Sequence, residues 1–102
     1  MKQVLIGRSA QADIIVDSEI KTVSAKHATV EWDGVQYKLH DHSANGSYVN
    51  GEKIHNDTCV IRKGDVVTLS RKYTLDLNAV FALLAYNATK AEAPASVDDM
   101  ID

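Results

Sequence analysis

The sequence contains one cysteine, one proline and no long apolar run. A single cysteine cannot form an intrachain disulfide, so Cys59 excludes a disulfide-stabilised fold, and its Thr and Val neighbours are typical of a strand. No stretch reaches the ~18 apolar residues of a membrane-spanning helix, and the first residues lack the apolar run of a secretion signal. We therefore expect a cytoplasmic protein without a membrane partner.

An excess of basic residues is also missing. Eleven Lys and Arg residues oppose fourteen Asp and Glu residues, which gives a net charge of −3. Residues 90–102 hold one Lys and four acids, so residues 1–89 carry ten charges of each sign. Nucleic-acid binding requires several basic side chains on one face. The balanced charge therefore argues against a nucleic-acid partner, and it still allows one or two local phosphate contacts.

Strand-forming residues, in contrast, are abundant. The 102 residues correspond to one domain, and 24 of them are Val, Ile or Thr, which favour sheets. Gly, Asn and Asp residues divide positions 1–77 into segments about eight to twelve residues apart, the spacing of a β-sandwich. The sequence therefore predicts an all-β domain, a two-sheet antiparallel sandwich, over residues 1–77.

The clearest local signal is the Asp-Gly pair at residues 33–34, which predicts a two-residue type I′ hairpin turn. With that turn, Val30 lies opposite Tyr37 and Ala28 lies opposite Leu39. Apolar pairs then alternate with polar pairs along the hairpin, so turn chemistry and side-chain period agree on one buried face.

The composition changes at Asn78, because seven of the twelve alanines follow it. Asn78 is the predicted N-cap of a short C-terminal helix over residues 78–90, whose apolar stripe predicts packing on the sandwich or, alternatively, on a second chain. The stripe consists of Leu77, Phe81, Leu84, Ala85 and Ala88. Residues 91–102 are acidic and contain the only proline, which predicts a flexible, disordered tail.

Three polar stretches, at residues 7–9, 23–27 and 41–47, lie at the ends of predicted strands. Loops gather at the ends of a sandwich, so side chains from different stretches can converge on one ligand. A phosphate group needs a guanidinium for charge, with hydroxyl and main-chain N–H donors for its remaining oxygens. Arg8 and Ser24 are the candidates for these two roles.

Five motifs, in their order and spacing, resemble the forkhead-associated (FHA) domains. The motifs are Gly7-Arg8-Ser9, Asp13-Ile14, Ser24-x-x-His27-Ala28, Asp41-x-Ser43-x-Asn45-Gly46-Ser47-Tyr48-Val49-Asn50-Gly51 and Gly64-Asp65. They span residues 4–70, about two-thirds of the chain. The resemblance implies a sandwich whose loops at one end bind a phosphothreonine-containing protein or peptide. An upstream Ser/Thr kinase would write that mark, and the domain would need neither catalysis nor a cofactor.

The resemblance also implies roles for individual residues. Arg8 contacts the phosphate, Ser24 donates its hydroxyl to it, and Asn45 holds the peptide main chain. Lys26 and Ser43 add charge or a donor at the rim of the site. Structural support of the site is implied for Gly7, His27, Gly46 and Asn50.

Two positions depart from the family pattern. Ala25 follows Ser24 where relatives often carry a basic residue, which predicts a modest affinity for phosphate. Ala44 precedes Asn45 where many relatives carry Thr or a similar polar residue, so the sequence does not indicate which peptide side chains the site selects.

Two other classes of function are open on the sequence. A phosphate-independent assembly domain would form a homodimer through the C-terminal helix or an uncovered sheet edge. His40, Asp41 and His42 suggest zinc, but strand alternation separates the two histidines from the Leu39 face, and a closed site requires four convergent ligands. The sequence has neither a nucleophile elbow nor a Walker phosphate loop, so we expect no enzyme and no metal.

Overall fold

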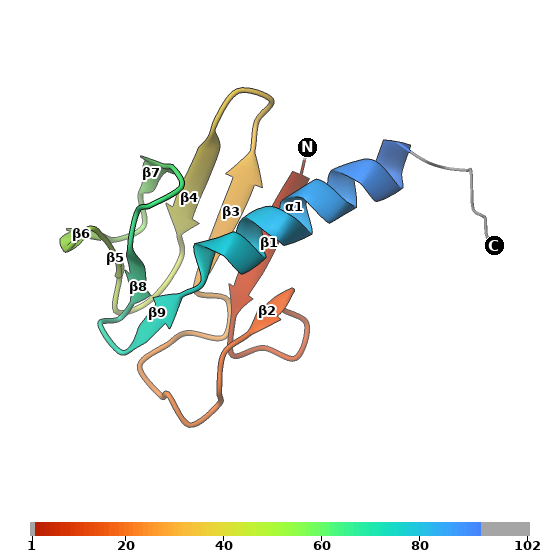
Figure 1. Cartoon of the computed structure of the whole chain (residues 1–102). Coiled ribbons are helices and arrows are strands. Elements are labelled where there is room, and N and C mark those ends of the chain that lie inside the picture. Colours follow the sequence, from red (N-terminus) through yellow and green to blue (C-terminus); the bar gives the residue numbers. More distant parts are fainter. Residues whose placement is uncertain (1, 93–102) are drawn as a thin grey trace.

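Nine strands and one helix form the part of the chain that the computed structural model describes, residues 2–92 (Figure 1). The elements are β1 (Lys2–Gly7), β2 (Ile14–Ile15), β3 (Ala28–Trp32), β4 (Tyr37–Asp41), β5 (Ser47–Val49), β6 (Glu52–Ile54), β7 (Thr58–Ile61), β8 (Val67–Leu69), β9 (Tyr73–Leu75) and α1 (Leu77–Glu92). The predicted tail over 91–102 falls, apart from its first two residues, outside the described residues.

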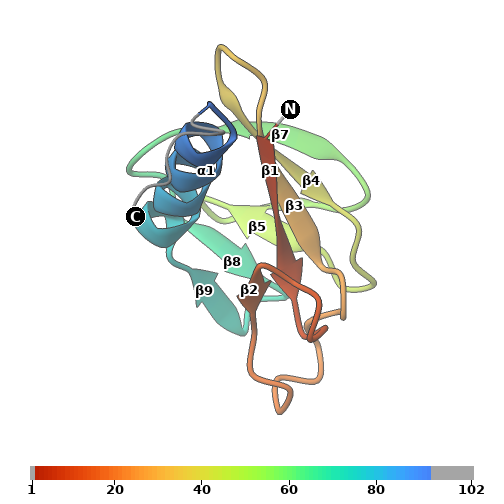
Figure 2. The ribbon, with the colours of Figure 1, turned by 90° about the vertical axis from the view of Figure 1, so that its right-hand side faces the viewer.

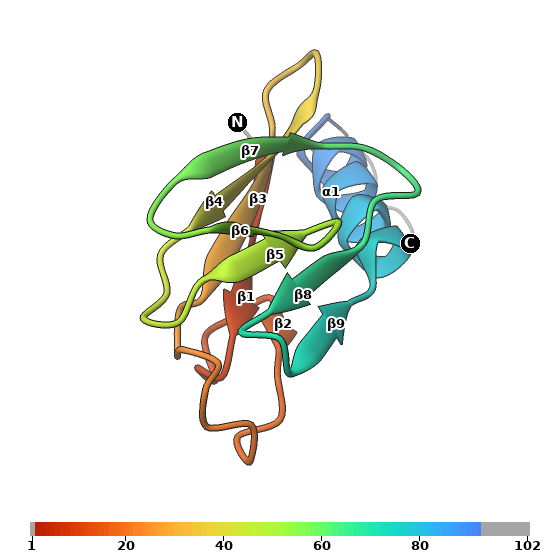
Figure 3. The ribbon, with the colours of Figure 1, turned by 90° about the vertical axis from the view of Figure 1, so that its left-hand side faces the viewer.

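The strands form two sheets, as the sequence predicts. One sheet has the order β2-β1-β3-β4-β7 and the other the order β6-β5-β8-β9 (Figure 3). All neighbours are antiparallel except β1 and β2, which run parallel with Ile6 opposite Ile14. The sequence predicted antiparallel sheets only, so this parallel pair differs from the prediction. Asp13 holds β2 beside β1, because its carboxylate accepts a hydrogen bond from Leu5 N at 2.8 Å and its own N donates to Leu5 O.

The core lies between the two sheets and is built by alternate residues of the strands. Its buried apolar side chains come from β1, β3 and β4 on one side and from β5 and β8 on the other. They include Val4, Ile6, Val30, Leu39, Val49, Val67 and Leu69. Because these residues recur every second position, the other side chains of the same strands face outward.

The β3–β4 hairpin differs from the predicted register. Val30 lies opposite Leu39, and the last strand pair is Trp32 with Tyr37. A four-residue loop therefore replaces the two-residue turn, and the pairing shifts by two positions. A shift of two keeps every side chain on its predicted face, so the predicted buried face survives the wrong register.

Side-chain chemistry explains this loop. The Asp33 carboxylate accepts hydrogen bonds of 2.8 Å from the N–H groups of Val35 and Gln36, which is an Asx-type turn. The longer loop also pairs Trp32 with Tyr37, whose ring centroids are 4.7 Å apart. The predicted register would have placed Val35, which is 82% exposed, opposite the tryptophan.

Helix α1 begins before the predicted start, because Asp76 rather than Asn78 is its N-cap. The Asp76 carboxylate accepts hydrogen bonds from Asn78 N at 3.0 Å and Ala79 N at 3.3 Å. Strand β9 ends at Leu75 and the helix begins at Leu77, so Asp76 occupies the capping position between them.

The helix packs against β1 and β3 along the side of the sandwich (Figures 1 and 2). Leu77, Phe81 and Leu84 are buried as predicted, together with Val80, whereas the predicted Ala85 is exposed. The prediction for Ala88 falls on a side chain outside the described ones. Within residues 2–92, no helix has the length and apolar character needed to cross a membrane.

Candidate functional site

Three loops from distant parts of the sequence meet at one end of the sandwich, opposite the β3–β4 turn (Figure 1). They follow β1, β2 and β4, and hydrogen bonds join them. Arg8 N donates to Ser24 O at 3.1 Å, and Ala44 N donates to Ser24 Oγ at 3.1 Å. The structure thus brings together the first, third and fourth of the sequence motifs.

Gly7 allows the first of these contacts by lacking a side chain. A Cβ atom on Gly7 would overlap the carbonyl oxygen of Ala25 and would lie 2.9 Å from the main-chain N of His27. Because those atoms are backbone, they cannot rotate away. Gly7 therefore permits β1 and the loop around Ser24 to approach closely.

Arg8 is half-buried, and main-chain carbonyl groups orient its guanidinium. Nε donates to Val23 O, and Nη1 lies 3.5 Å from Ser18 O. Among the described residues, no carboxylate forms an ion pair with this side chain. Its positive charge is thus positioned without being neutralised, an arrangement that favours an incoming anion.

Ser24 and Asn45 each tie one loop to another and keep a polar atom free. Ser24 Oγ accepts a hydrogen bond from Ala44 N. Its hydroxyl hydrogen has no acceptor among the described residues and is available to a ligand. Asn45 Nδ2 donates to Thr22 O at 2.8 Å, and the exposed amide keeps its oxygen for another partner. The pair can therefore offer one donor and one acceptor to a ligand.

His27 is fully buried and connects the loop of Ser24 to the loop of Gly46. Its Nδ1 accepts a hydrogen bond of 2.9 Å from Ser24 N, so the neutral ring carries its proton on Nε2, which donates to Gly46 O at 2.9 Å. Burial lowers the pKa of His27 and outweighs the opposing effects of the Gly46 hydrogen bond and of Asp41. The ring is held in the neutral form that both hydrogen bonds need.

Asp41 supports the loop after β4, a role that the sequence motif contains but that sequence reasoning did not assign. Its buried carboxylate accepts from Ser43 Oγ at 2.8 Å, Ser47 Oγ at 2.7 Å and Asn56 N at 2.9 Å. Burial alone would raise the pKa of Asp41, but hydrogen bonds from Asn56, Ser47 and Ser43 lower it. The sequence signal for this role was the presence of Asp41 in the same motif as Ser43 and Ser47.

Three predicted site residues lie where the sequence did not place them or make no contact there. Ser43 is buried, not at the rim, and its Oγ also accepts from Gly46 N at 2.7 Å. Asn50 lies at the far end of β5, where it bonds Asp65 at 3.1 Å, so it braces the opposite end of the sheet. Lys26 is exposed on the loop of Ser24, with no described hydrogen bond from its side chain.

Among the side chains that the structure describes, no group of three or more His, Cys, Asp or Glu residues lies close enough to hold a metal ion. The histidines that suggested zinc have other partners. His40 bonds Glu31 at 2.7 Å and Thr58 at 2.8 Å, and His42 bonds Thr29 at 3.1 Å. The polar groups that the described residues place at this end of the sandwich include the guanidinium of Arg8, the hydroxyl of Ser24 and the amide of Asn45.

A two-sheet sandwich that carries these residues on the loops at one end is typical of the FHA class. Comparison with known proteins leads to the same class. The FHA domain profile matches residues 4–70, so the chain belongs to the FHA domain family. The resemblance of the five motifs is thereby confirmed. No curated protein sequence matches the chain.

Several solved structures, FHA domains among them, are similar to this chain. The FhaA FHA domain in complex with the intracellular domain of Rv3910 has 28% identity and a TM-score of 0.61, with 72% of this chain and 75% of that chain covered. Mycobacterium tuberculosis EmbR in complex with a low-affinity phosphopeptide has 30% identity and a TM-score of 0.64, with 72% and 18% covered. The N-terminal FHA domain of S. cerevisiae Rad53p, in complex with a phosphothreonine peptide, has 28% identity and a TM-score of 0.61, with 67% and 56% covered.

Proposed function

We propose that this chain is a phosphothreonine-dependent peptide-recognition module without catalytic activity. The observation that carries the proposal is the pairing of Arg8 with Ser24, which main-chain hydrogen bonds hold at one end of the sandwich while the guanidinium stays un-neutralised. Two of the similar solved structures, EmbR and the N-terminal FHA domain of Rad53p, are complexes with phosphopeptides, which supports the same function here.

The phosphate group is gripped by charge and directional donors together. It carries about −1.5 to −2 charges, which the Nη atoms of Arg8 and the hydroxyl hydrogen of Ser24 meet, with Lys26 adding positive charge on the same loop. Each charge-assisted hydrogen bond contributes about 1.5–3 kcal/mol. After desolvation, the site distinguishes phosphothreonine from threonine by about 2–4 kcal/mol, or roughly 30- to 1,000-fold.

Asn45 holds the peptide main chain next to the phosphothreonine. Its side chain is already fixed by the hydrogen bond to Thr22 O, so its free amide oxygen is oriented to accept a peptide N–H. A main-chain contact carries no side-chain selectivity, and it positions the peptide across the loop after β4.

The module reads a mark that another protein writes. A Ser/Thr kinase adds the phosphate to a partner protein, and the domain binds the modified partner, which places it in signal transduction. The buried stripe of α1 packs on its own β1 and β3, and this packing favours recognition over assembly through the helix.

A binding assay with two peptide libraries tests the proposal. Fluorescence anisotropy compares degenerate peptides with a central phosphothreonine against the same library with unmodified threonine. The natural chain should bind only the phosphorylated library, and Arg8→Ala should weaken binding about 10- to 100-fold. Ser24→Ala should weaken it by a smaller factor, because one neutral donor is lost.

The control is Arg62→Ala, which removes the same charge from the exposed loop after β7, away from Arg8. It should leave binding unchanged. Equal binding to the two libraries would overturn the proposal, and so would unchanged binding in both Arg8→Ala and Ser24→Ala.

A further inference from the structure

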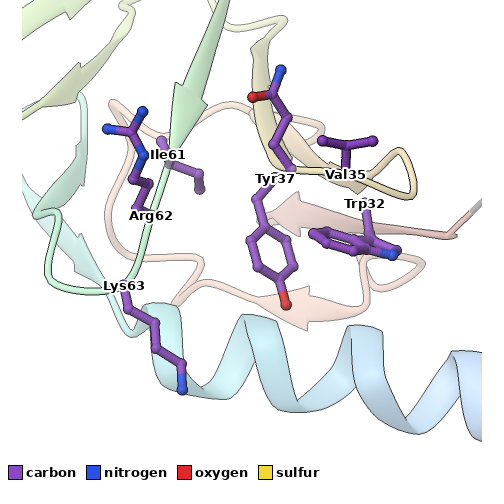
Figure 4. A pocket seen from close by; sticks show the side chains of 7 residues that line it. Trp32, Val35, Tyr37, Ile61, Arg62 and Lys63 are labelled. Carbon is purple, nitrogen blue, oxygen red and sulfur yellow. The ribbon is translucent and has the colours of Figure 1, made fainter.

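A groove of about 340 Å³ lies at the end of the sandwich opposite Arg8 (Figure 4). Its lining residues are Trp32, Val35, Gln36, Tyr37, Ile61, Arg62 and Lys63. Strand β3 runs from Ala28, beside His27, to Trp32, so one strand length, about 13–17 Å, separates this groove from the phosphothreonine site. The groove is independent of that proposed function.

The floor of the groove is aromatic and continues onto α1. Figure 4 shows Trp32 and Tyr37 side by side above the helix, and a second hollow of about 220 Å³ lies between these rings and Leu84 with Ala85. Val35, at the upper edge, is 82% exposed. A contiguous exposed apolar surface of this kind marks a contact site for another segment.

The groove also carries unpaired positive charge. Figure 4 shows Lys63 extending alongside α1, whereas Arg62 turns to the other side of its strand. Among the side chains that the structure describes, residues 3–85, no carboxylate forms an ion pair with either of these two. A segment that fits must therefore combine apolar side chains for the floor with carboxylates for Lys63.

We propose that residues 97–102 of this same chain dock in the groove. Their sequence is Val-Asp-Asp-Met-Ile-Asp, with three apolar side chains and three carboxylates. Val97, Met100 and Ile101 supply the apolar contacts, and the neighbouring aspartates supply negative charge for the ammonium group of Lys63. The segment has the chemistry that the groove requires.

The chain is long enough to reach. Helix α1 passes the groove at Leu84 and Ala85 and ends at Glu92, seven residues or about 10 Å further on. The five residues from Glu92 to Val97 span up to about 17 Å, so the chain can turn back to Trp32. Residues 97–102 then cover a similar length along the groove toward Lys63.

Docking would cover the apolar surface of the groove and would leave the phosphothreonine site at the other end of the sandwich accessible. The partly exposed rings of Trp32 and Tyr37 would be covered by a segment held through about one or two exposed ion pairs and a few apolar contacts. Such a segment binds weakly, so high salt, which shortens the screening length, should release it.

Paramagnetic broadening in the full chain tests the docking. A nitroxide label is attached at Ser96→Cys in a Cys59→Ser background, which leaves one labelled thiol. The proposal predicts broadening of the amide signals of Val35 and Lys63 and of the Trp32 indole, but not of the Ser24 amide. Broadening should decrease in high salt. Its absence, or broadening spread evenly over the domain, would overturn the proposal.

Charge variants in the same labelled chain test the ion pair. Lys63→Glu should reduce the docked-to-undocked ratio about two- to fivefold, the value of one exposed pair, and Asp98→Lys should restore it in the double variant. The control Lys72→Glu changes the same charge on the β8–β9 turn and should have no effect. Equal effects of Lys63→Glu and Lys72→Glu would overturn the assignment of Lys63.

Two further measurements separate the remaining outcomes. Mixing labelled chain with unlabelled isotope-enriched chain should produce no broadening, and broadening in the mixture would show that the segment of a second copy occupies the groove, which overturns docking within one chain. In unlabelled chain, Met100→Ser should raise the accessibility of Trp32, the only tryptophan, to acrylamide. Unchanged quenching would contradict the proposal even if the labelled background failed to fold.

Discussion

His27→Ala is the substitution that tests most directly how the candidate site is held together. The imidazole is fully buried and joins Ser24 N to Gly46 O through hydrogen bonds of 2.9 Å each. Removing it leaves a partly buried N–H and a buried C=O without partners, at a cost of about 1–3 kcal/mol each, with the N–H near the lower end of that range. The vacated volume adds to that cost, and a water molecule between the two polar groups offsets part of it.

The expected net loss is about 3 kcal/mol in the free energy of unfolding, a large fraction of the roughly 5–15 kcal/mol of a typical domain. Urea unfolding at pH 7.5, followed by the fluorescence of Trp32, measures this loss. Binding of the phosphothreonine library should also weaken, about tenfold, because the loop that carries Ser24 loses its brace.

His27→Asn is the matched control. The Asn side-chain oxygen can occupy a position close to that of Nδ1, so it keeps the hydrogen bond from Ser24 N while losing the one to Gly46 O. It should lose about half as much stability as His27→Ala. If His27→Ala lies within about 1 kcal/mol of the natural chain, or is no less stable than His27→Asn, the bridging role of this ring is refuted.

Three further predictions concern the support of the site and the helix. Gly7→Ala should lower the free energy of unfolding by about 1–3 kcal/mol and weaken phosphopeptide binding, because the new Cβ meets backbone atoms. Gly34→Ala, where nothing lies within 4 Å of the new Cβ, should leave binding unchanged. Calorimetric unfolding measures the change in stability, and anisotropy measures binding by both variants. Because burial lowers the pKa of His27 below its ordinary 6.5, the unfolded state takes up the proton first, and stability should fall as the pH drops from 6.5 toward the folded pKa. The loss between pH 7.5 and 5 should be at most about 2 kcal/mol and should be absent in His27→Asn, as urea titrations at both pH values would show. Asp76→Ala should lower stability by about 1 kcal/mol through loss of the helix cap, and Asn78→Ala should not, which thermal unfolding distinguishes.

Local patterns in the sequence were enough to predict the two-layer architecture and the series of motifs. Alternation of apolar residues every second position, as at Val4 and Ile6 or Val67 and Leu69, specified the inner face of each sheet, because successive side chains point to opposite sides of a strand. The spacing of five motifs indicated the FHA family. Both signals are local in the chain, so they can be recognised without coordinates.

The pairings between distant segments, in contrast, depend on the packed fold. The turn dipeptide at residues 33–34 favoured a register that aromatic packing of Trp32 with Tyr37 overrode. The predicted cap Asn78 gave way to Asp76, because β9 ends at Leu75. The side chain of Ser43 turned inward because a buried carboxylate lies beside it. A hydrogen bond or ring contact depends on distances between segments, and those distances are fixed only when the whole core has packed.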